Sequence, residues 1–550
     1  EPVSEIVTIF GSGSFTENTP CVLGDGRILY TRWEYVNRDA VSYHHLWTMS
    51  PDGTAQMVYY GNGRPGGVFI DAQAVPGGSE VVFTLSPGHG TNEHGGSVAV
   101  VRPGLGPDSP AAVRVVAHGR DFRDPFPLGE ERYLAARGHE IVLLDEAGGC
   151  QTVYRGGEMV HEPRLVARRP RERVIHPQAD LRRPTATLVL ADAYAGRRME
   201  TVKRGSARRL LVMEELPKPA NYHGGGSQPI GHGVTSTLKR VLGTVPVEAD
   251  GSAHFEAPAL RSLYFALLDE NDLCIKQMRS FVTLQPGETA GCVGCHEPRT
   301  QAPAHAGSAT AAAARPASRI EPAAGAPDVV DFPRDVQPVL DRHCAGCHNA
   351  RDRKGGVVLS GDRGVVYSLA YYELLLHWQT QDTAGSPCDG TGRQHGNDEP
   401  YGSFSGGAPL MRKIDSHHHD VKLSAPERTA VRLWIDTASQ YAGTYAAIGT
   451  GQIGGCWGNN RPVREMADNW PETPACREAV ERRCAPCHGR MMPRHATDQL
   501  PLSFGDMLSW ERPLSRFSRH RLFNLTRPEA SLILLAPLAK AAGGYATAPA

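Results

Sequence analysis

Three cysteine pairs, each followed directly by a histidine, are the residues of this chain whose spacing indicates chemistry. They are Cys292, Cys295 and His296; Cys344, Cys347 and His348; and Cys484, Cys487 and His488. The C-x-x-C-H spacing is typical of covalent haem c attachment. Each thiol forms a thioether with a haem vinyl group, and the adjacent histidine becomes an axial ligand of the iron. The sequence therefore predicts three covalently bound haem c groups.

The alternative interpretation of each pair is a zinc site or a redox-active dithiol. Structural zinc sites typically join two C-x-x-C elements and need no histidine at a fixed position after each. Three pairs with the histidine at the same offset favour haem. A haem with a second His or Met ligand carries electrons, whereas an open sixth position binds small ligands. The function therefore depends on the residue opposite each motif histidine.

Candidate second ligands follow the second motif. The first choice for the second haem is one residue of the triplet His417, His418 and His419. The triplet lies just before a predicted helix, far enough along the chain to fold back over the haem. Weaker candidates are Met411 and His377, and a solvated polar turn is the non-ligand interpretation of the triplet.

The first and third haems have less distinct candidates. For the third haem, His520 is the first choice because it precedes a compact turn into the last helix. Alternatives near it are Met491, Met492, His495 and Met507. For the first haem, the candidates are Met278, His223, His232 and His254. Since none of these is distinctive, the first haem is the one expected to keep an open position.

Composition and charge exclude several classes of protein. The chain has 550 residues and a formal net charge of -1, so nothing points to nucleic acid or an anionic membrane surface. No apolar run of about 20 residues occurs, so no transmembrane helix is expected. Haem c is attached outside the cytoplasm, and the chain opens at Glu1 without a signal peptide. We therefore expect a mature periplasmic or extracellular chain.

Six cysteines lie outside the motifs: Cys21, Cys150, Cys274, Cys388, Cys456 and Cys476. An even number in an oxidising compartment allows up to three disulfides, with Cys456 and Cys476 as the first-choice pair. Buried free thiols are the alternative. Five histidines are expected in N-terminal loops as surface residues, with a structural Ca or Zn ion as the other interpretation: His44, His45, His89, His94 and His161.

Residues 1–215 are interpreted as repeated β-structure. Residues 46–61 and 141–156 share Gly, Gln, Val, Tyr and Gly at matching positions, and a weaker echo occupies residues 188–192. Each unit reads as strand, turn and strand. A repeat of about 40–50 residues favours the radially stacked blades of a β-propeller, incomplete at its N-terminus, over an irregular β-sandwich.

Four further regions follow. Residues 216–300 alternate like the strands of a small β-sandwich-like middle domain that carries the first motif. Residues 301–327 are rich in Ala and Pro and predict a linker. Residues 328–450 and 451–550 each read as an α-helical, cytochrome c-like region around one motif. Helices are expected to run into Cys344 and Cys484, to span residues 371–378, and to begin at a capping box of Ser424 and Glu427.

Residues 242–255, Leu268-Asp-Glu-Asn, Met278-Arg-Ser-Phe and Gln285-Pro-Gly-Glu288 before the first motif carry a family resemblance. With residues 25–35 and 46–53, they resemble hydrazine synthase alpha subunit-like proteins. Residues 338–344 and 434–436 resemble the cytochrome c modules often joined to that family. The resemblance implies a propeller, a haem-bearing β domain and a C-terminal cytochrome region.

Two features depart from the hydrazine-forming members of that family. The resemblance implies a tyrosine as haem ligand one turn past the first motif, with the motif histidine turned to a metal. Here the fourth residue after His296 is Thr300, so His296 is expected to bind the iron. The third motif is the other departure. Architecture alone does not fix chemistry.

The leading hypothesis from the sequence is an extracytoplasmic triheme cytochrome that transfers electrons to redox protein partners or other cytochrome subunits. One alternative is an oxidoreductase of small nitrogen compounds such as NO or hydroxylamine, with the first haem catalytic. Another is a subunit of a larger respiratory complex or a cytochrome filament, in a homo- or hetero-oligomer. The number of ligands on the first haem iron distinguishes the electron-carrier hypothesis from the enzyme hypothesis.

Overall fold

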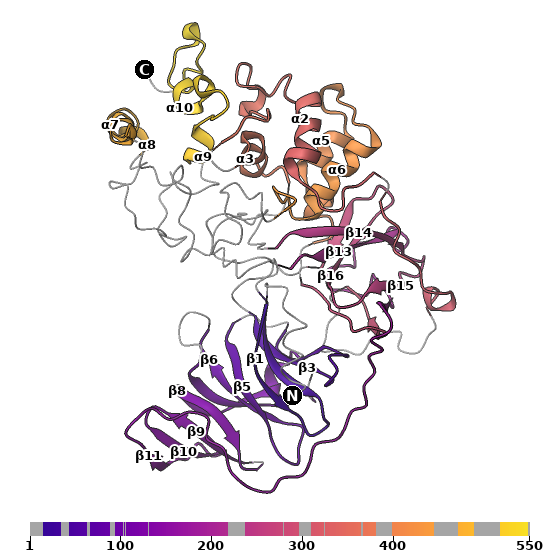
Figure 1. Cartoon of the computed structure of the whole chain (residues 1–550), viewed down its shortest axis with the longest axis vertical. Coiled ribbons are helices and arrows are strands. Elements are labelled where there is room, and N and C mark those ends of the chain that lie inside the picture. Colours follow the sequence, from indigo (N-terminus) through magenta and orange to yellow (C-terminus); the bar gives the residue numbers. More distant parts are fainter. Residues whose placement is uncertain are drawn as a thin grey trace.

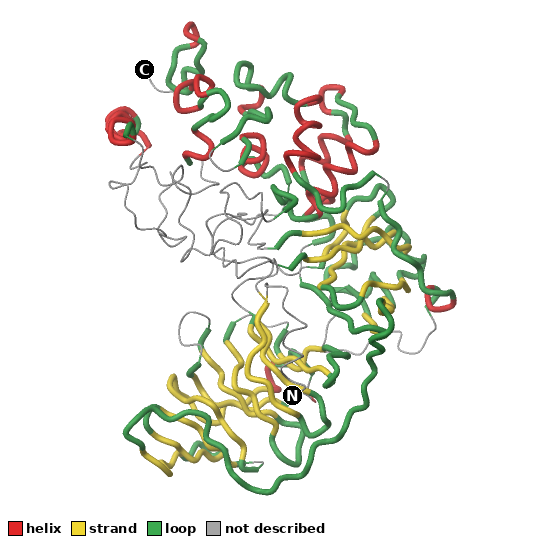
Figure 2. The backbone as a smooth tube through the Cα atoms, in the orientation of Figure 1, coloured by secondary structure: helices red, strands yellow, loops and turns green. Residues whose placement is uncertain are grey.

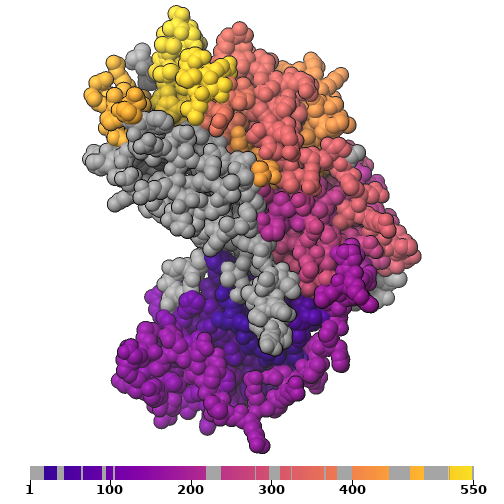
Figure 3. All heavy atoms as spheres, viewed as in Figure 1, coloured from indigo at the N-terminus to yellow at the C-terminus, as the bar shows by residue number. Residues whose placement is uncertain are grey.

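The computed structural model describes residues 15–34, 43–62, 66–88, 94–102, 104, 106–129, 131–217, 237–278, 280–295, 310–323, 325–364, 367–380, 399–444, 471–488 and 518–547. These form a β-rich N-terminal region, a β-rich middle domain and a helical C-terminal region, from indigo through magenta to yellow in Figure 1. An extended segment, residues 156–184, runs from the first region to the second (Figure 2). Figure 3 shows the same succession on the molecular surface.

The N-terminal region is one sheet of eleven strands in the described part of the chain. The strands are β1 (Phe15–Val22), β2 (Ile28–Glu34), β3 (His44–Met49), β4 (Met57–Tyr60), β5 (Val68–Ala74), β6 (Val81–Ser86), β7 (Gly96–Val101), β8 (Val113–Pro127), β9 (Arg132–Arg137), β10 (Glu140–Asp145) and β11 (Cys150–Arg155). The repeat seen in the sequence corresponds to two antiparallel hairpins, β3–β4 and β10–β11. The predicted strand–turn–strand units are thus confirmed.

The strands fall into three groups: β1–β4, β5–β7 and β8–β11. The first strands of the groups lie beside one another and each carries a bulge with a left-handed residue, namely Thr19, Asp71 or Asp124. These residues recur about 50 residues apart, in the range of propeller repeats. The Asp71 amide donates to the Thr19 hydroxyl across two groups (3.1 Å). The described strands do not close into a ring, so the complete propeller stays a prediction.

The middle domain consists of two facing sheets. One has the order β15 (Ala253–Pro258), β12 (Thr185–Leu190), β18 (Thr289–Cys292); the other has β14 (Lys239–Pro246), β13 (Arg209–Glu215), β16 (Ser262–Leu268), β17 (Cys274–Gln277). Strand alternation gives β13 two buried faces. Leu210 and Val212 pack toward the three-stranded sheet, whereas Leu211 and Met213 pack toward the C-terminal helices. The four-stranded sheet therefore lies between two cores.

The middle sheets begin earlier than the predicted boundary at residue 215. Both β12 and β13 precede it, yet they pair with β15, β16 and β18. The sequence echo at residues 188–192 is thus a strand of a different sheet. Alternating apolar residues look alike in any half-buried strand, which is why periodicity placed it with the N-terminal repeat.

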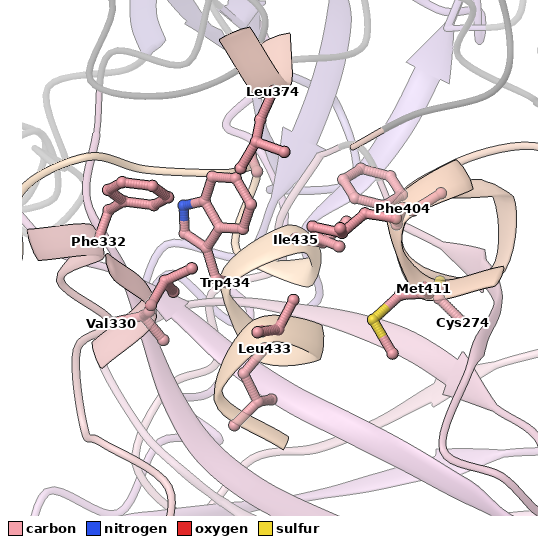
Figure 4. Packing of buried hydrophobic residues seen from close by; sticks show 14 of the residues in the cluster. Cys274, Val330, Phe332, Leu374, Phe404, Met411, Leu433, Trp434 and Ile435 are labelled. Carbon is pink, nitrogen blue, oxygen red and sulfur yellow. The ribbon is translucent and has the colours of Figure 1, made fainter. Parts of the chain in front are cut away.

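The helical region contains α2 (Gln337–His343), α3 (Leu369–Leu376), α4 (Phe404–Gly407), α5 (Pro409–Asp415), α6 (Ala425–Asp436), α7 (Thr473–Arg483), α8 (Ala485–His488), α9 (Arg519–Leu522) and α10 (Leu532–Leu535). Figure 4 shows its core, in which Trp434 of α6 packs with Phe332 and Leu374. The predicted helices into Cys344 and Cys484 are confirmed, as is the capping box of Ser424 and Glu427. In the described residues no helix is long and apolar enough to cross a membrane.

Candidate functional site

The first motif lies at the end of a strand. β18 runs parallel to β12, with Cys292 opposite Leu190. Beyond the strand, the Ala191 amide donates to the Cys292 carbonyl (2.8 Å) and the Asp192 amide to the Val293 carbonyl (3.1 Å). Backbone hydrogen bonds therefore fix the peptide that carries the two thiols.

Two glycines let the first motif approach residues 191–196 closely. A β-carbon at Gly294 would lie 1.8 Å from the Ala195 carbonyl oxygen, and one at Gly196 would lie 1.9 Å from that of Cys295. Real β-carbons do not come so near another backbone. Glycine at both positions therefore holds the two segments in direct backbone contact.

A cavity of about 660 Å³ opens beside the first motif. Cys292, Gly294 and Cys295 form part of its wall, and the volume lies in the range typical of ligand sites. Its apolar lining comes from both middle sheets and includes Leu188, Leu190, Leu210, Phe255, Phe265 and Leu267. Arg32, Trp47, Gln56 and Met57 line it from the N-terminal region. The cavity is therefore formed jointly by two regions of the chain.

Polar groups in the cavity wall indicate which kind of ligand would fit there. In the described part of the chain, Gln56 Nε2 and Gln277 Oε1 are buried without a hydrogen-bond partner. The cations Arg32 and Lys276 also line the cavity. Apolar walls beside two thiols, with polar and cationic groups elsewhere, fit a flat apolar macrocycle that carries carboxylates. His296 lies outside the described residues, so its position relative to the cavity stays a prediction.

The second motif continues a helix. The Cys344 amide donates to the Leu340 carbonyl of α2 (2.8 Å), and the His348 amide to the Cys344 carbonyl (3.0 Å). His348 Nδ1 lies 2.8 Å from the Lys354 carbonyl oxygen. A carbonyl only accepts, so Nδ1 carries the proton and Nε2 is left as the ligand atom.

His418 is the member of the predicted triplet that lies opposite His348. The two ring centroids are 6.4 Å apart and the ring planes differ by 20°. Two metal–nitrogen bonds of about 2 Å each, as histidines make in proteins, fit between rings at this separation. His418 belongs to a short turn in which His417 and His419 have left-handed φ angles of 55° and 49°. Such backbone strain is typical of functional turns.

The ionisation of the second motif argues against a redox dithiol. Burial raises the pKa of Cys344 to about 11, with the neighbouring Cys347 thiol as a smaller cause. Redox-active pairs instead have a lowered thiol pKa. Desolvation, with the charges of His419, His348 and Lys413, lowers the pKa of His418 and favours the neutral imidazole. In the described part of the chain no group of three His, Cys, Asp or Glu residues is arranged to hold a metal ion.

The third motif repeats the backbone of the second. α7 leads into Cys484, whose amide donates to the Val480 carbonyl (2.8 Å), and the His488 amide donates to the Cys484 carbonyl (2.9 Å). Val480 and Cys484 pack against Leu522 of α9. His520 belongs to α9, but its side chain lies outside the described part, so its ligand role stays a prediction.

Several weaker candidates are already engaged elsewhere. His377 Nε2 lies 3.1 Å from Glu373, which also pairs with Arg521 (2.9 Å). Met411 is buried in the helical core near Cys274 (Figure 4). His254 Nδ1 lies 3.2 Å from the Arg315 carbonyl. Met278, by contrast, lines the cavity of the first motif. The candidates outside the described residues are His223, His232, Met491, Met492, His495 and Met507.

The structure also tests the expectations for the N-terminal histidines and for the cysteines outside the motifs. His44 and His45 are not surface loop residues: both lie in β3 and are buried, because β3 is an inner strand covered by its neighbours. Cys21 and Cys150 form no disulfide. The Cys456–Cys476 pair stays a prediction, since Cys456 lies outside the described residues, as does Cys388.

The N-terminal half of the cavity wall was not predicted from the sequence. Arg32 and Trp47 carry no motif, and only the packing of β2 (Ile28–Glu34) and β3 against the middle domain brings them beside the first motif. An arginine in the middle of an apolar strand is the one available signal, since a buried cation needs a specific partner.

Comparisons with known proteins agree with this architecture. Residues 205–297 match the family model of the hydrazine synthase alpha subunit middle domain. The structure of Kuenenia stuttgartiensis hydrazine synthase aligns over 78% of this chain and 70% of its own, with a TM-score of 0.59 and 18% identity. A gamma-CGTase of an alkalophilic Bacillus clarkii aligns with a TM-score of only 0.11, which carries no structural meaning. No curated protein sequence was found to match. Residues 205–297 are therefore similar to the hydrazine synthase alpha subunit middle domain, and the fold of the chain is similar to that of hydrazine synthase.

Proposed function

We propose that this chain is a multihaem c-type oxidoreductase of small nitrogen compounds, in which a haem at Cys292 and Cys295 is the reacting centre. Haems at the second and third motifs deliver or remove electrons. The support is a family match at the domain that carries the first motif, and a fold like that of hydrazine synthase. This reading ranks above a carrier whose three haems are all six-coordinate.

One observation carries the proposal: the surroundings of the first two motifs differ. The first faces a cavity of about 660 Å³, whereas the second motif histidine faces His418 across 6.4 Å. A second histidine closes a haem and suits it to electron transfer, while free space beside a haem admits a substrate. When bound, the first haem would supply an open coordination position and one-electron chemistry.

The chain's own residues would position and shield this reaction. The backbone contacts at Gly196 and Gly294 hold the thiols in place. The apolar side chains around the cavity exclude water, which strengthens electrostatic interactions inside it. Met57 and Met278 both line the same cavity, and Met278 is the one of them that the sequence offered as a sixth ligand. If Met278 occupied that position, the site would become a carrier.

Location and partners follow from the cofactor and the family. We propose a periplasmic or extracellular location, because covalent haem attachment takes place outside the cytoplasm. The matched family describes an alpha subunit, so we also propose assembly with other cytochrome subunits. A structural Ca or Zn ion in the N-terminal region stays a hypothesis.

The test is a visible spectrum of the reduced holoprotein with and without CO, with haem counted by mass. Three haems and a CO complex at one haem per chain are expected. Turnover of NO or hydroxylamine is then measured. Three haems with no CO-induced change would overturn the enzyme proposal in favour of a carrier, and a mass without haem would overturn both.

A further inference from the structure

We infer that residues 164–173, here called the arginine segment, are a docking surface for an acidic polypeptide segment of a partner protein, which pairs with them as a β-strand. The arginine segment belongs to the extended stretch that runs along the outside of the molecule from the N-terminal sheet to the middle domain (Figure 2). The inference is independent of the haem chemistry proposed above. Its support is the local charge, the unpaired backbone and the exposed aliphatic side chains.

The arginine segment carries a surplus of positive charge that the chain as a whole lacks. Over the whole chain, 58 basic residues nearly balance 59 acidic ones, whereas the segment has five arginines and a single acidic residue, Glu172. All five arginines are exposed, namely Arg164, Arg168, Arg169, Arg171 and Arg173. A cluster of exposed arginines attracts carboxylates and steers an acidic partner toward the surface that carries it.

Neighbouring residues neutralise little of this charge. In the part of the chain that the structure describes, the ion pair of the segment lies within it, between Arg169 and Glu172 (3.1 Å). The Arg164 guanidinium lies over the Phe126 ring (5.2 Å) and donates to the uncharged Pro163 carbonyl (3.0 Å). Carboxylates of a partner therefore have arginines to pair with.

The backbone of the arginine segment is open to a partner strand. Among the described residues, no backbone N–H between positions 164 and 172 donates a hydrogen bond. The flanks are anchored, because the Glu162 amide donates to Asp124 (2.9 Å) and the Arg173 amide to the Gly24 carbonyl (3.3 Å). An extended chain with unpaired N–H and C=O groups is what an added β-strand pairs with.

The position of the proline determines which edge of the segment can pair. Pro170 has no N–H, so it suits only the unpaired edge of a strand. The partner would then pair with residues 165, 167, 169 and 171, whose N–H and C=O groups point to the other edge. Arg169 and Arg171 are two positions apart and fall on one face of such a strand. Carboxylates at every second position of the partner would meet them.

The aliphatic side chains and the open backbone together select the class of partner. Leu165 is 53% exposed and Val166 is 99% exposed, so apolar contact area lies beside the charge. No aromatic residue occurs between positions 161 and 184, so nucleic acid bases find no stacking surface. Lipid cannot pair with backbone N–H and C=O groups. A polypeptide supplies donors, acceptors, carboxylates and aliphatic groups at once.

The test measures binding of a fluorescein-labelled decapeptide of alternating Glu and Val to the full-length holoprotein by fluorescence anisotropy. Its Lys–Val counterpart is the control for charge. The same Glu–Val peptide, N-methylated at alternate residues, lacks the backbone donors for strand pairing. On the protein, Arg168→Gln with Arg171→Gln is compared with Arg182→Gln with Arg183→Gln. The second pair makes the same charge change outside the arginine segment, where Arg182 is already paired with Asp180 (2.8 Å).

Saturable binding of the Glu–Val peptide is expected, with none of the Lys–Val peptide. Arg168→Gln with Arg171→Gln should raise the Kd about tenfold, and the control pair by less than about twofold. N-methylation should weaken binding to the unsubstituted protein, a measurement that depends on no variant. Absence of binding, equal loss in both arginine pairs, or full binding of the N-methylated peptide would each overturn the inference. Tighter binding of oligothymidylate, or of vesicles of equimolar phosphatidylcholine and phosphatidylserine, through the same arginines would overturn it in favour of a nucleic acid or a membrane.

Discussion

The first and second motifs contain the same chemical groups on different kinds of backbone. Cys292 ends an edge strand that pairs with β12, whereas Cys344 follows a helix and continues its hydrogen-bond pattern. The strand places the thiols beside a cavity shared with another region of the chain. The helix places His348 near the surface, opposite a turn that contains His418. The first motif therefore lies beside a cavity, whereas the second lies opposite a second histidine.

The two motifs therefore share their sequence pattern but differ in their surroundings, and the proposed division of roles rests on that difference. The residue at the third position of each motif reflects this difference in backbone. Gly294 in the first motif has no room for a side chain, whereas a β-carbon added at Gly346 in the second would meet nothing within 4 Å. The third motif, on a helix end like the second, carries Pro486 there. A position that accepts proline on one backbone requires glycine on the other.

Removal of either cysteine pair should give the largest effect. Cys292→Ser with Cys295→Ser is expected to lower the haem count from three to two and abolish the CO complex. Cys344→Ser with Cys347→Ser is expected to lower the count equally but leave the CO complex intact. Mass spectrometry and CO difference spectra measure both. A CO complex that survives the first double substitution would place the reacting haem elsewhere.

Replacement of His418 should make the second site resemble the first. His418→Ala is expected to turn one low-spin haem high-spin and to add a second CO complex per chain, because the imidazole opposite His348 is gone. His417→Ala and His419→Ala are matched controls from the same turn and should leave the spectrum unchanged. A low-spin spectrum in the His418 variant would contradict this ligand assignment.

The sequence predicted the motifs, the helices before them and the capping box because each depends on local spacing. It also indicated the His417–His419 turn, since a ligand must follow its motif at a distance that permits folding back. The sequence did not select His418, because this choice depends on φ angles of the turn and on the Lys354 carbonyl that orients His348.

The cavity of the first motif was beyond prediction for a different reason. Its walls come from β2, β3 and the middle sheets, which only tertiary packing brings together. Pairing of β12 with β18 also depends on contacts between residues about 100 positions apart, which periodicity does not reveal. Local sequence patterns therefore predicted the thiols of the first motif but not the cavity beside them.

A single methyl group should distinguish the two backbones. Gly294→Ala is expected to destabilise the protein by about 1–3 kcal/mol or more, because its β-carbon would overlap the Ala195 carbonyl. Gly346→Ala, the matched substitution in the second motif, should change the free energy of unfolding by less than about 0.5 kcal/mol. Chemical denaturation of the two holoproteins measures both values. Equal effects would show that the contact at Ala195 does not hold the first motif in place.

The smallest expected effect is an opposite response to pH in the N-terminal sheet and in the helical region. Burial, followed by the charge of Asp124, raises the pKa of Asp71 in the N-terminal sheet to about 7. A raised carboxyl pKa stabilises the fold while the group is neutral. This contribution is complete below about pH 4 and is lost as the pH rises through 7.

Hydrogen bonds from Ser424, then from His343, lower the pKa of Glu427 at the start of α6 to about 2. That contribution is present above about pH 4.5 and is lost as the pH falls toward 2. Hydrogen-exchange protection should therefore weaken in β5 and β8 as the pH rises from about 4 to 7, and in α6 below about pH 4. Asp71→Asn should remove the first response only, because its amide does not ionise. If both regions weakened in the same direction, the two carboxylates would not be the groups that set local stability.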